Sequence, residues 1–392
     1  MKKYFKLASL LKVAKIILIF IVLPALTLTS GYWWGKYDIV KWGKTSYDNV
    51  TWYNESDGGI NDGAMVKIGG YDQFVRIRGR NLDNPVFIEL HGGPGGAGSG
   101  FTHRMLRPLT EYFTVVEWDQ RGVGRSSWDD AIIPTMTYEQ MVDDTIEVID
   151  WALKKTGKSK VIVAGHSWGS MLGVGVVKKR PDLVHVYLGV GQMVAWNRNF
   201  EESRRLLMEK AKKVGADMTY DMLSSVPDNY PTTRDNSDVS NYIAGVQRHL
   251  FGLKNGFSYA LKDGNIFPAE MVLDTVFSPD NSVKEVVEMF MVGAGEFSPP
   301  VMELIHDLSK VDYLKDEAYQ SLDVPVIIFQ GKHDYQTPKT LAEEWFDKVK
   351  APHKQYFEFE HSAHVIFTDE FAKYNYLLVD VVRPFAMANG DE

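Results

Sequence analysis

Short apolar runs that end at glycine-rich turns constrain the fold of this chain more than any other feature. "PVFIEL" at 85–90 leads into "HGGPGG", "FTVVEW" at 113–118 into "DQRGVG", and "KVIVAG" at 160–165 into "HSWGS". Such runs, bounded by turn residues, are typical of buried strands. Helical segments separate several of them, and strands that alternate with helices predict an α/β fold with a mostly parallel sheet covered on both faces.

The ends of two further elements are also marked. Strand-like runs on either side of Gly69-Gly70 predict a hairpin near the start of the folded region. Thr137 followed by Gln140 forms a capping-box pattern, and Gly157 is a typical helix terminator, so we expect a helix that ends at about Thr156.

Two later apolar runs, at 324–331 and 354–360, return the chain to the sheet after a long stretch of different character. Residues 195–320 contain helical segments and many methionines but no strong strand pattern. We expect them to form a helical cap over the carboxyl edge of the sheet, where ligands bind in open α/β folds. The expected α/β core then consists of 61–194 and 321–390.

The N-terminus differs from the rest of the chain. Five lysines and no acidic residue occupy "MKKYFKLASLLKVAK", and residues 16–34 carry no charge. About 19 residues are near the minimum for a membrane-spanning helix, and preceding lysines favour a cytoplasmic N-terminus. We therefore expect a membrane anchor at 1–35, a linker at 36–60 and an exported catalytic domain. A cleaved signal peptide, which would release a secreted or periplasmic protein, is the alternative, followed by a buried helix.

Composition excludes several other kinds of chemistry. The chain has no cysteine, so disulfides, thiolate catalysis and cysteine-bound zinc are excluded. A formal net charge of -8 argues against a general nucleic-acid binder. The sequence lacks the G-x-x-x-x-G-K-[ST] phosphate-binding loop, and we expect no cofactor or metal. Nothing in the sequence indicates an oligomeric state.

"GHSWG" at 165–169 matches the G-x-S-x-G pattern between a strand and a helix. That pattern holds a serine on a tight turn with its hydroxyl available for reaction, which makes Ser167 a candidate nucleophile. A plain strand–loop–helix turn is the alternative. A nucleophilic serine needs donors for the oxyanion, and the backbone N–H of Trp168 is the expected first donor. The second should come from "HGGPG", from Gly92 or Gly93, and we favour Gly93.

Nucleophilic serine also needs a base and an acid that orients it. Asp334 follows the run at 324–331 and precedes an expected helix with Thr337 as its cap. His361 and His364 both follow the last strand, and either one is a candidate base. A metal cluster that includes these two histidines is disfavoured because the H-E-x-x-H motif is absent. The order of nucleophile, acid and histidine is that of α/β-hydrolases.

These motifs resemble the α/β-hydrolase fold family, and more narrowly its proline iminopeptidase-like branch. The resemblance covers about residues 60–385 and rests on "HGGPG", "WDQRGVGRS", "GHSWGS", "GKHD" and "SAH". It implies a triad of Ser167, Asp334 and His364, because the histidine of the family lies in an "SGH"-like turn that matches "SAH". It also implies structural roles for Asp119 and Arg121, and cleavage of a small peptide or ester substrate.

Two features depart from that branch. His166 stands where proline iminopeptidases usually have glycine, and the local pattern of their amine-binding cap glutamates is absent. The remaining cap candidates are Glu201, Glu202, Glu270, Glu288 and Glu296. The resemblance therefore implies an aminopeptidase that releases N-terminal residues, often proline, with a carboxylesterase or other small acyl hydrolase as the alternative. A non-catalytic binding protein on the same fold is the third hypothesis.

Overall fold

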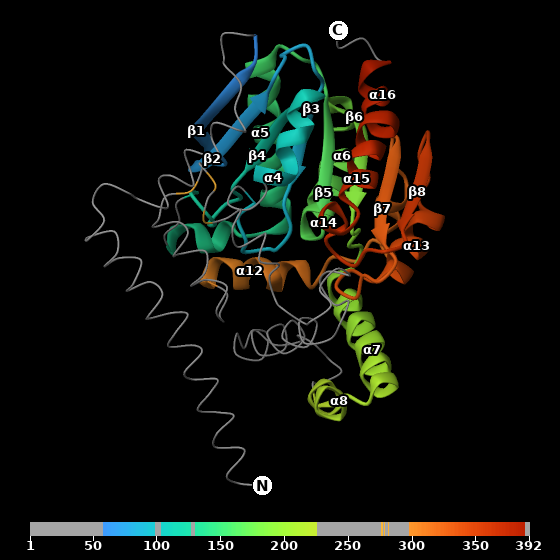
Figure 1. Cartoon of the computed structure of the whole chain (residues 1–392). Helices are drawn as coiled ribbons and strands as arrows, with labels where there is room; N and C mark the ends of the chain where they lie inside the picture. Colours follow the sequence, from blue (N-terminus) through green and yellow to red (C-terminus); the bar gives the residue numbers. More distant parts are fainter. Residues whose placement is uncertain are drawn as a thin grey trace, which may run out of the picture.

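The computed structural model describes residues 58–98, 103–126, 130–225 and 298–388, together with three isolated positions between 276 and 281. One eight-stranded sheet runs through these residues, in the order β1-β2-β4-β3-β5-β6-β7-β8 (Figure 1). Its strands are β1 (Ile60–Ile68), β2 (Tyr71–Gly79), β3 (Val86–Leu90), β4 (Thr114–Trp118), β5 (Val161–His166), β6 (Val184–Val190), β7 (Val326–Gly331) and β8 (Lys354–Phe359).

The sheet is antiparallel at one edge and parallel elsewhere. β1 and β2 form the expected hairpin, and Gly69 and Gly70 both have positive φ in its two-residue turn. β2 pairs with β4 in antiparallel orientation, and the six strands from β3 to β8 pair in parallel. Every residue of β3, β4, β6 and β7 is buried, which explains their continuous apolar runs. The predicted mostly parallel sheet is confirmed.

Helices cover both faces of the sheet (Figure 1). One core cluster contains apolar side chains from the sheet and from α5 (Tyr138–Thr156), α6 (Trp168–Lys179) and α13 (Lys339–Lys348). The other contains side chains from α4 (His103–Leu106), α14 (Ile366–Asp369), α15 (Phe371–Leu377) and α16 (Arg383–Met387). Burial of apolar area on both faces supplies the main driving force for this arrangement.

The ends of α5 are those that the sequence predicts. The side chain of Thr137 accepts a hydrogen bond from the backbone N–H of Gln140 at 3.2 Å, and Gly157 ends the helix at φ +73°. α13 differs from the expectation, because Pro338 and not Thr337 precedes its first residue. The hydroxyl of Thr337 donates to Asp334 instead, so Thr337 does not cap the helix.

Between β6 and β7 the chain leaves the sheet and returns to it. Its described helices are α7 (Trp196–Val214), α8 (Asp217–Ser224) and α12 (Pro299–Leu308), which lie below the sheet in Figure 1. The outgoing and returning segments pair at their base: Ala195 bridges Asp312, and Tyr313 N–H donates to Val194 O at 2.8 Å. We call this pairing the stem. Only the ends of the predicted cap at 195–320 are described, since most of 226–297 lies outside the described residues.

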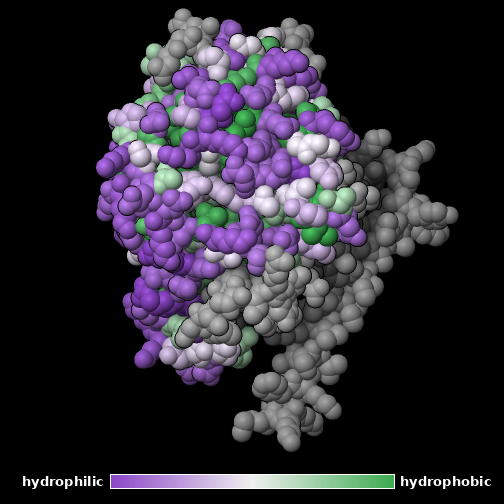
Figure 2. Space-filling view, turned by 180° about the vertical axis from the view of Figure 1, so that it is seen from behind, coloured by the Kyte–Doolittle hydropathy of each residue, from purple (hydrophilic) through white to green (hydrophobic). Residues whose placement is uncertain are grey.

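The predicted membrane anchor at 1–35 and nearly all of the linker at 36–60 also lie outside the described residues. Among the helices that the structure does describe, none has the length and apolar character needed to cross a bilayer. The face in Figure 2 is mostly hydrophilic where its residues are described, with hydrophobic residues scattered among the polar ones. Scattered apolar residues are ordinary on protein surfaces.

Candidate active site

Ser167 forms the entire connection between β5 and α6. Its backbone has φ 56° and ψ −123°, and among the described residues it is the one non-glycine residue with positive φ. Its N–H donates to Val190 O on β6 at 2.9 Å, and its carbonyl accepts from the N–H of Ser170 at 2.9 Å. The neighbouring strand and the first helical turn therefore hold a conformation that costs about 1–3 kcal/mol for an L-residue. A strained strand-to-helix turn of this kind directs a serine hydroxyl toward the substrate site, although Ser167 itself is buried here, with 3% of its surface exposed.

The outer glycines of the pentad are required by close backbone approach. A Cβ on Gly165 would lie 2.3 Å from the carbonyl oxygen of Gly169. A Cβ on Gly169 would lie 2.0 Å from the carbonyl oxygen of Leu90 and 2.8 Å from that of His91. These neighbours are backbone atoms, which cannot turn aside as a flexible side chain can. The G-x-S-x-G pattern is therefore needed to pack β5, α6 and the loop after β3 together.

Asp334 and His364 come from the ends of β7 and β8 and meet at the same edge of the sheet. Nδ1 of His364 lies 2.9 Å from Oδ2 of Asp334, and both side chains are almost fully buried. Asp334 Oδ1 accepts from the backbone N–H groups of Gln336 and Thr337 at 2.8 Å each, and Oδ2 accepts from the Thr337 hydroxyl at 2.7 Å. The structure brings His364 to the acid, whereas His361 is exposed.

The Asp334 carboxylate is held in its ionised form. Burial by itself raises its pKa, but the charge of His364 and the hydrogen bonds from His364 and Thr337 outweigh burial and bring the pKa below its ordinary value. An ionised Asp334 accepts a hydrogen bond from Nδ1–H of His364. The other ring nitrogen, Nε2, then carries the lone pair that a base needs.

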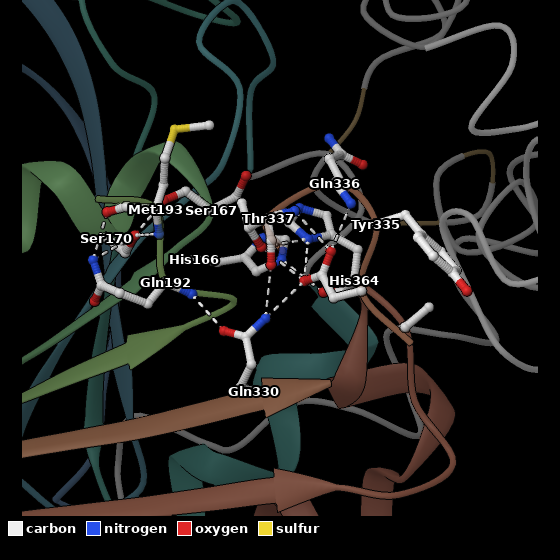
Figure 3. Close-up of polar contacts among 12 residues, drawn as sticks. His166, Ser167, Ser170, Gln192, Met193, Gln330, Tyr335, Gln336, Thr337 and His364 are labelled. Atoms are coloured by element: carbon white, nitrogen blue, oxygen red, sulfur yellow. Dashed lines mark hydrogen bonds and ion pairs between the residues drawn. The ribbon is translucent and has the colours of Figure 1, made fainter. Parts of the chain in front are cut away.

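Two glutamines extend this network, and neither was predicted from the sequence. Gln330 Nε2 donates to Asp334 Oδ2 at 3.3 Å and to Thr337 O at 2.9 Å (Figure 3). Gln330 Oε1 accepts from the backbone N–H of Gln192 at 3.0 Å, and Gln192 Nε2 donates to Ser170 Oγ at 3.2 Å. A buried chain of hydrogen bonds thus joins the acid to the first turn of α6. The available signal was a glutamine that ends the apolar run "VIIFQ".

The serine side of this chain is equally well connected. The hydroxyl of Ser170 donates to the carbonyl of Ser167 and accepts from the backbone N–H of Met193 at 2.9 Å. Gly191, which directly precedes Gln192, packs against the acid–histidine pair, because a Cβ there would be 3.3 Å from Asp334 Oδ2 and 3.4 Å from His364 Cε1. The serine turn and the acid–histidine pair therefore share one rigid frame at the carboxyl ends of β5 to β8.

The predicted oxyanion loop lies against the serine. A Cβ on Gly92 would be 3.1 Å from Cβ of Ser167 and 3.2 Å from Nδ1 of His166. Gly93 follows at φ +136° and precedes Pro94 through a cis peptide bond. Trp168 begins α6, where free N–H groups and the helix dipole favour negative charge. The structure thus brings to the serine turn both the loop that contains Gly92 and Gly93, through Gly92, and the first residue of α6, Trp168.

A buried glutamine ties the loop to the helix. Gln120 Nε2 donates to His91 O at 3.1 Å, and Gln120 Oε1 accepts from Nε1–H of Trp168 at 2.9 Å. His91 is itself buried, and burial lowers its pKa despite the opposing effects of Gly92 O and the Asp119 charge. A neutral His91 places no positive charge beside the serine turn.

Asp119 and Arg121, from the "DQRG" segment, have structural partners. Nε and Nη2 of Arg121 each lie 2.7 Å from an oxygen of Asp144, and both side chains are buried. Nη2 also donates to Gly69 O at 3.1 Å. Asp119 Oδ2 accepts from the backbone N–H of Arg125 at 2.9 Å. This segment therefore fixes the β1–β2 hairpin and the loop after β4 relative to α5.

The candidate amine-binding glutamates are only partly described. Glu201 is exposed on α7, and Glu202 pairs with Arg205 at 2.7 Å and accepts from Thr340 Oγ1 at 3.0 Å. Glu270, Glu288 and Glu296 lie outside the described residues. Within the described ranges, no group of three or more His, Asp or Glu side chains is arranged to hold a metal ion.

Comparison with known proteins agrees with this geometry. Residues 85–233 match the family model described as the alpha/beta hydrolase fold. The chain is 29% identical over 313 residues to the probable aminopeptidase YbaC of Bacillus subtilis (strain 168), covering 78% of this chain and 91% of that protein. It is 25% identical over 328 residues to a proline iminopeptidase of Saccharolobus solfataricus, covering 80% of this chain and 88% of the relative.

Solved structures support the fold. The crystal structure of a proline iminopeptidase from Mycobacterium smegmatis superimposes with a TM-score of 0.56 at 17% identity, covering 84% of this chain and 100% of that one. An esterase from Exiguobacterium antarcticum gives a TM-score of 0.52 at 16% identity, covering 82% and 100%. The chain therefore is a hydrolase of the α/β-hydrolase fold, and its similarity to proteins named aminopeptidase and proline iminopeptidase confirms the resemblance seen in its sequence.

Proposed function

We propose that the protein is a serine hydrolase in which Ser167 is the nucleophile, His364 the base and Asp334 the group that orients the base. The observation that carries this proposal is the 2.9 Å contact between His364 Nδ1 and Asp334 Oδ2, at the sheet edge that also holds the strained turn at Ser167. The contact commits Nδ1 to the acid and leaves Nε2 for the serine proton.

In the proposed reaction, Ser167 Oγ attacks the substrate carbonyl carbon while His364 Nε2 takes the hydroxyl proton. The backbone N–H groups of Trp168 and Gly93 bind the oxyanion of the tetrahedral intermediate. Collapse of that intermediate breaks the bond to the leaving group, which receives the proton from His364. Water, deprotonated by His364, then hydrolyses the acyl-enzyme and restores Ser167.

We propose release of N-terminal residues from small peptides as the activity. Its support is the similarity, over most of the chain, to relatives named probable aminopeptidase and proline iminopeptidase. The second candidate is hydrolysis of small acyl esters. It is favoured by the state of the two described cap glutamates of the five candidates: Glu201 is exposed to solvent and Glu202 is paired with Arg205, so neither is a buried, unpaired carboxylate of the kind expected to bind a substrate amine.

We also propose the organisation of the full chain. The segment 195–320, which leaves the sheet at the stem, forms a cap over the site between core parts 61–194 and 321–390. An anchor at 1–35 and a linker at 36–60 place the catalytic domain on the exported side of a membrane, with signal cleavage as the alternative. Alkaline extraction of membranes, with detection of an intact N-terminus by mass spectrometry, tests the anchor; release of a shortened chain supports cleavage.

A paired assay tests the activity. Wild-type protein and Ser167→Ala are compared on prolyl and alanyl arylamides and on short-chain aryl esters. We expect arylamide cleavage by the wild type and its loss in the variant. Unchanged activity in Ser167→Ala would refute the mechanism. Cleavage of esters without arylamides would replace the peptidase proposal with the esterase.

A further inference from the structure

His166, the residue before the candidate nucleophile, contacts the loop that carries the candidate base. Its Nε2 lies 3.1 Å from the backbone oxygen of His364. Its ring centroid is 4.6 Å from that of the His364 ring, and the Phe367 ring meets it edge-on at 5.0 Å. On its other side, a Cβ on Gly92 would lie 3.2 Å from Nδ1. This one side chain, on the residue before Ser167, thus contacts both the oxyanion loop and the histidine loop, and Figure 3 shows it beside His364.

The protonation state of His166 determines which atom donates the hydrogen bond in its contact with the His364 carbonyl. Burial, and next the charge of His364, lower its pKa to about 3, against smaller opposing effects of the His364 carbonyl and Asp334; His91 adds a further lowering. The ring is therefore neutral at physiological pH and carries one N–H. A carbonyl oxygen can only accept, so the proton lies on Nε2, and His166 donates to the main chain of His364.

The main chain around His364 is held by contacts of its own loop, and His166 adds one from the end of β5. His364 lies in the loop between β8 and α14, where the N–H of the preceding Ala363 donates to Asp369 Oδ2 at 3.0 Å. Asp334 fixes the His364 side chain at Nδ1, but a hydrogen bond at one end of a ring permits the ring to tilt about it. A displacement of about 1 Å at a reacting group can cost on the order of 100-fold in rate.

We propose that His166 is a positioning residue that fixes the backbone of His364 by donating from Nε2, and so aligns the base with Ser167. This inference rests on the proposed serine hydrolase function. It assigns a role to the position at which this chain departs from the glycine usual in proline iminopeptidases. The N–H donor is the essential part, whereas ring volume fills the space against Phe367.

Two variants separate the donor from the ring. His166→Gln keeps an amide N–H at a similar reach, and His166→Phe keeps an aromatic ring of similar size but has no donor. We expect His166→Gln to retain kcat within about threefold of wild type. We expect His166→Phe to lower kcat by about 10- to 100-fold with little change in KM, since substrate contacts are kept. Melting temperatures of both variants, measured by circular dichroism, verify that they are folded.

A second readout does not need turnover. The proton on Nδ1 of His364, bound to Asp334, can be followed by its downfield proton NMR signal in the wild type; we expect it to shift in His166→Phe and to return toward its wild-type position in His166→Gln. Wild-type kcat in His166→Phe, or equal losses in both variants, would overturn the role of the donor. Failure of the proposed function is distinct, because Ser167→Ala would then keep its activity whatever happens at His166.

Discussion

Because the turn at Ser167 is strained, we expect glycine at this position to stabilise the fold relative to alanine, which is the opposite of its usual effect. We compare Ser167→Gly with Ser167→Ala, because both remove the hydroxyl and its contacts. At φ 56° and ψ −123° an L-residue pays about 1–3 kcal/mol, and glycine, with no Cβ, avoids that cost. Glycine also adds about 0.5–1 kcal/mol of unfolded-chain entropy that folding must remove. Ser167→Gly should therefore be more stable than Ser167→Ala, by about 1 kcal/mol from the middle of both ranges and by at most about 2.5 kcal/mol.

Urea unfolding of the two purified variants, followed by circular dichroism, measures this difference directly. Ser309 supplies a matched control, because it lies at φ −59° and ψ −17° at the end of α12, where an L-residue is unstrained. There the glycine variant should be less stable than the alanine variant by roughly 0.5–1 kcal/mol. Both Ser167 variants should be inactive.

The order of the two Ser167 variants is the decisive result. If Ser167→Gly is less stable than Ser167→Ala by the same margin as the Ser309 pair, Ser167 does not have positive φ in the folded protein. Ser167 would then not lie on a strained turn, whatever the activity of the wild type.

Three further predictions concern the frame of the site. Burial, and next the charge of Glu117, raise the pKa of Glu89 to about 8, so the folded state keeps a proton that the unfolded state loses near 4.5. The free energy of unfolding of the wild type should therefore fall by up to about 1.4 kcal/mol per pH unit as the pH rises through this interval. Glu89→Gln should flatten this pH dependence, which urea unfolding at pH 5, 6.5 and 8 measures. Parallel curves would contradict the assignment. Gly169→Ala should abolish folding or activity, because its Cβ would overlap the backbone after β3; soluble yield and circular dichroism test this, and a folded, fully active variant would contradict it. Arg121→Met leaves the buried Asp144 carboxylate without its ion-pair partner, and thermal unfolding should show a loss of stability of about 3–5 kcal/mol. Replacement of both Arg121 and Asp144 by apolar residues should restore part of that stability. A loss under about 1 kcal/mol would contradict a buried ion pair that excludes water.

Local sequence rules predicted the elements whose causes are local. The cap and terminator of α5, at Thr137 and Gly157, depend on residues within one helix, and the Gly69-Gly70 turn depends on two adjacent residues. Apolar runs bounded by turns located the central strands for the same reason. Ser167 was predicted as the nucleophile from the G-x-S-x-G pattern, and its two outer glycines are required by close backbone approach, which is why the pattern is visible in the sequence.

Features that depend on contacts across the sheet were not predictable in this way. Gln330 and Gln192 bond each other between neighbouring strands that are far apart in sequence, and neither has a local pattern. Thr337 has the residue type and position of a helix cap, yet its hydroxyl serves Asp334, because the buried carboxylate needs donors more than the helix end does. The choice of His364 over His361 required a family resemblance, since both follow the same strand.

The stem between β6 and β7 has a consequence for how this architecture can change. The chain departs after Val190 and returns to β7, whose Phe329 is the register partner of Val190 in the adjacent strand. The bridge between Ala195 and Asp312 joins the outgoing and returning segments close to the sheet. Everything beyond that pairing is topologically a single loop, so its length and composition can be exchanged between related chains without altering the order or register of the strands that hold Ser167, Asp334 and His364. Chimeras joined at 196 and 311 would therefore inherit chemistry from one parent and selectivity from the other.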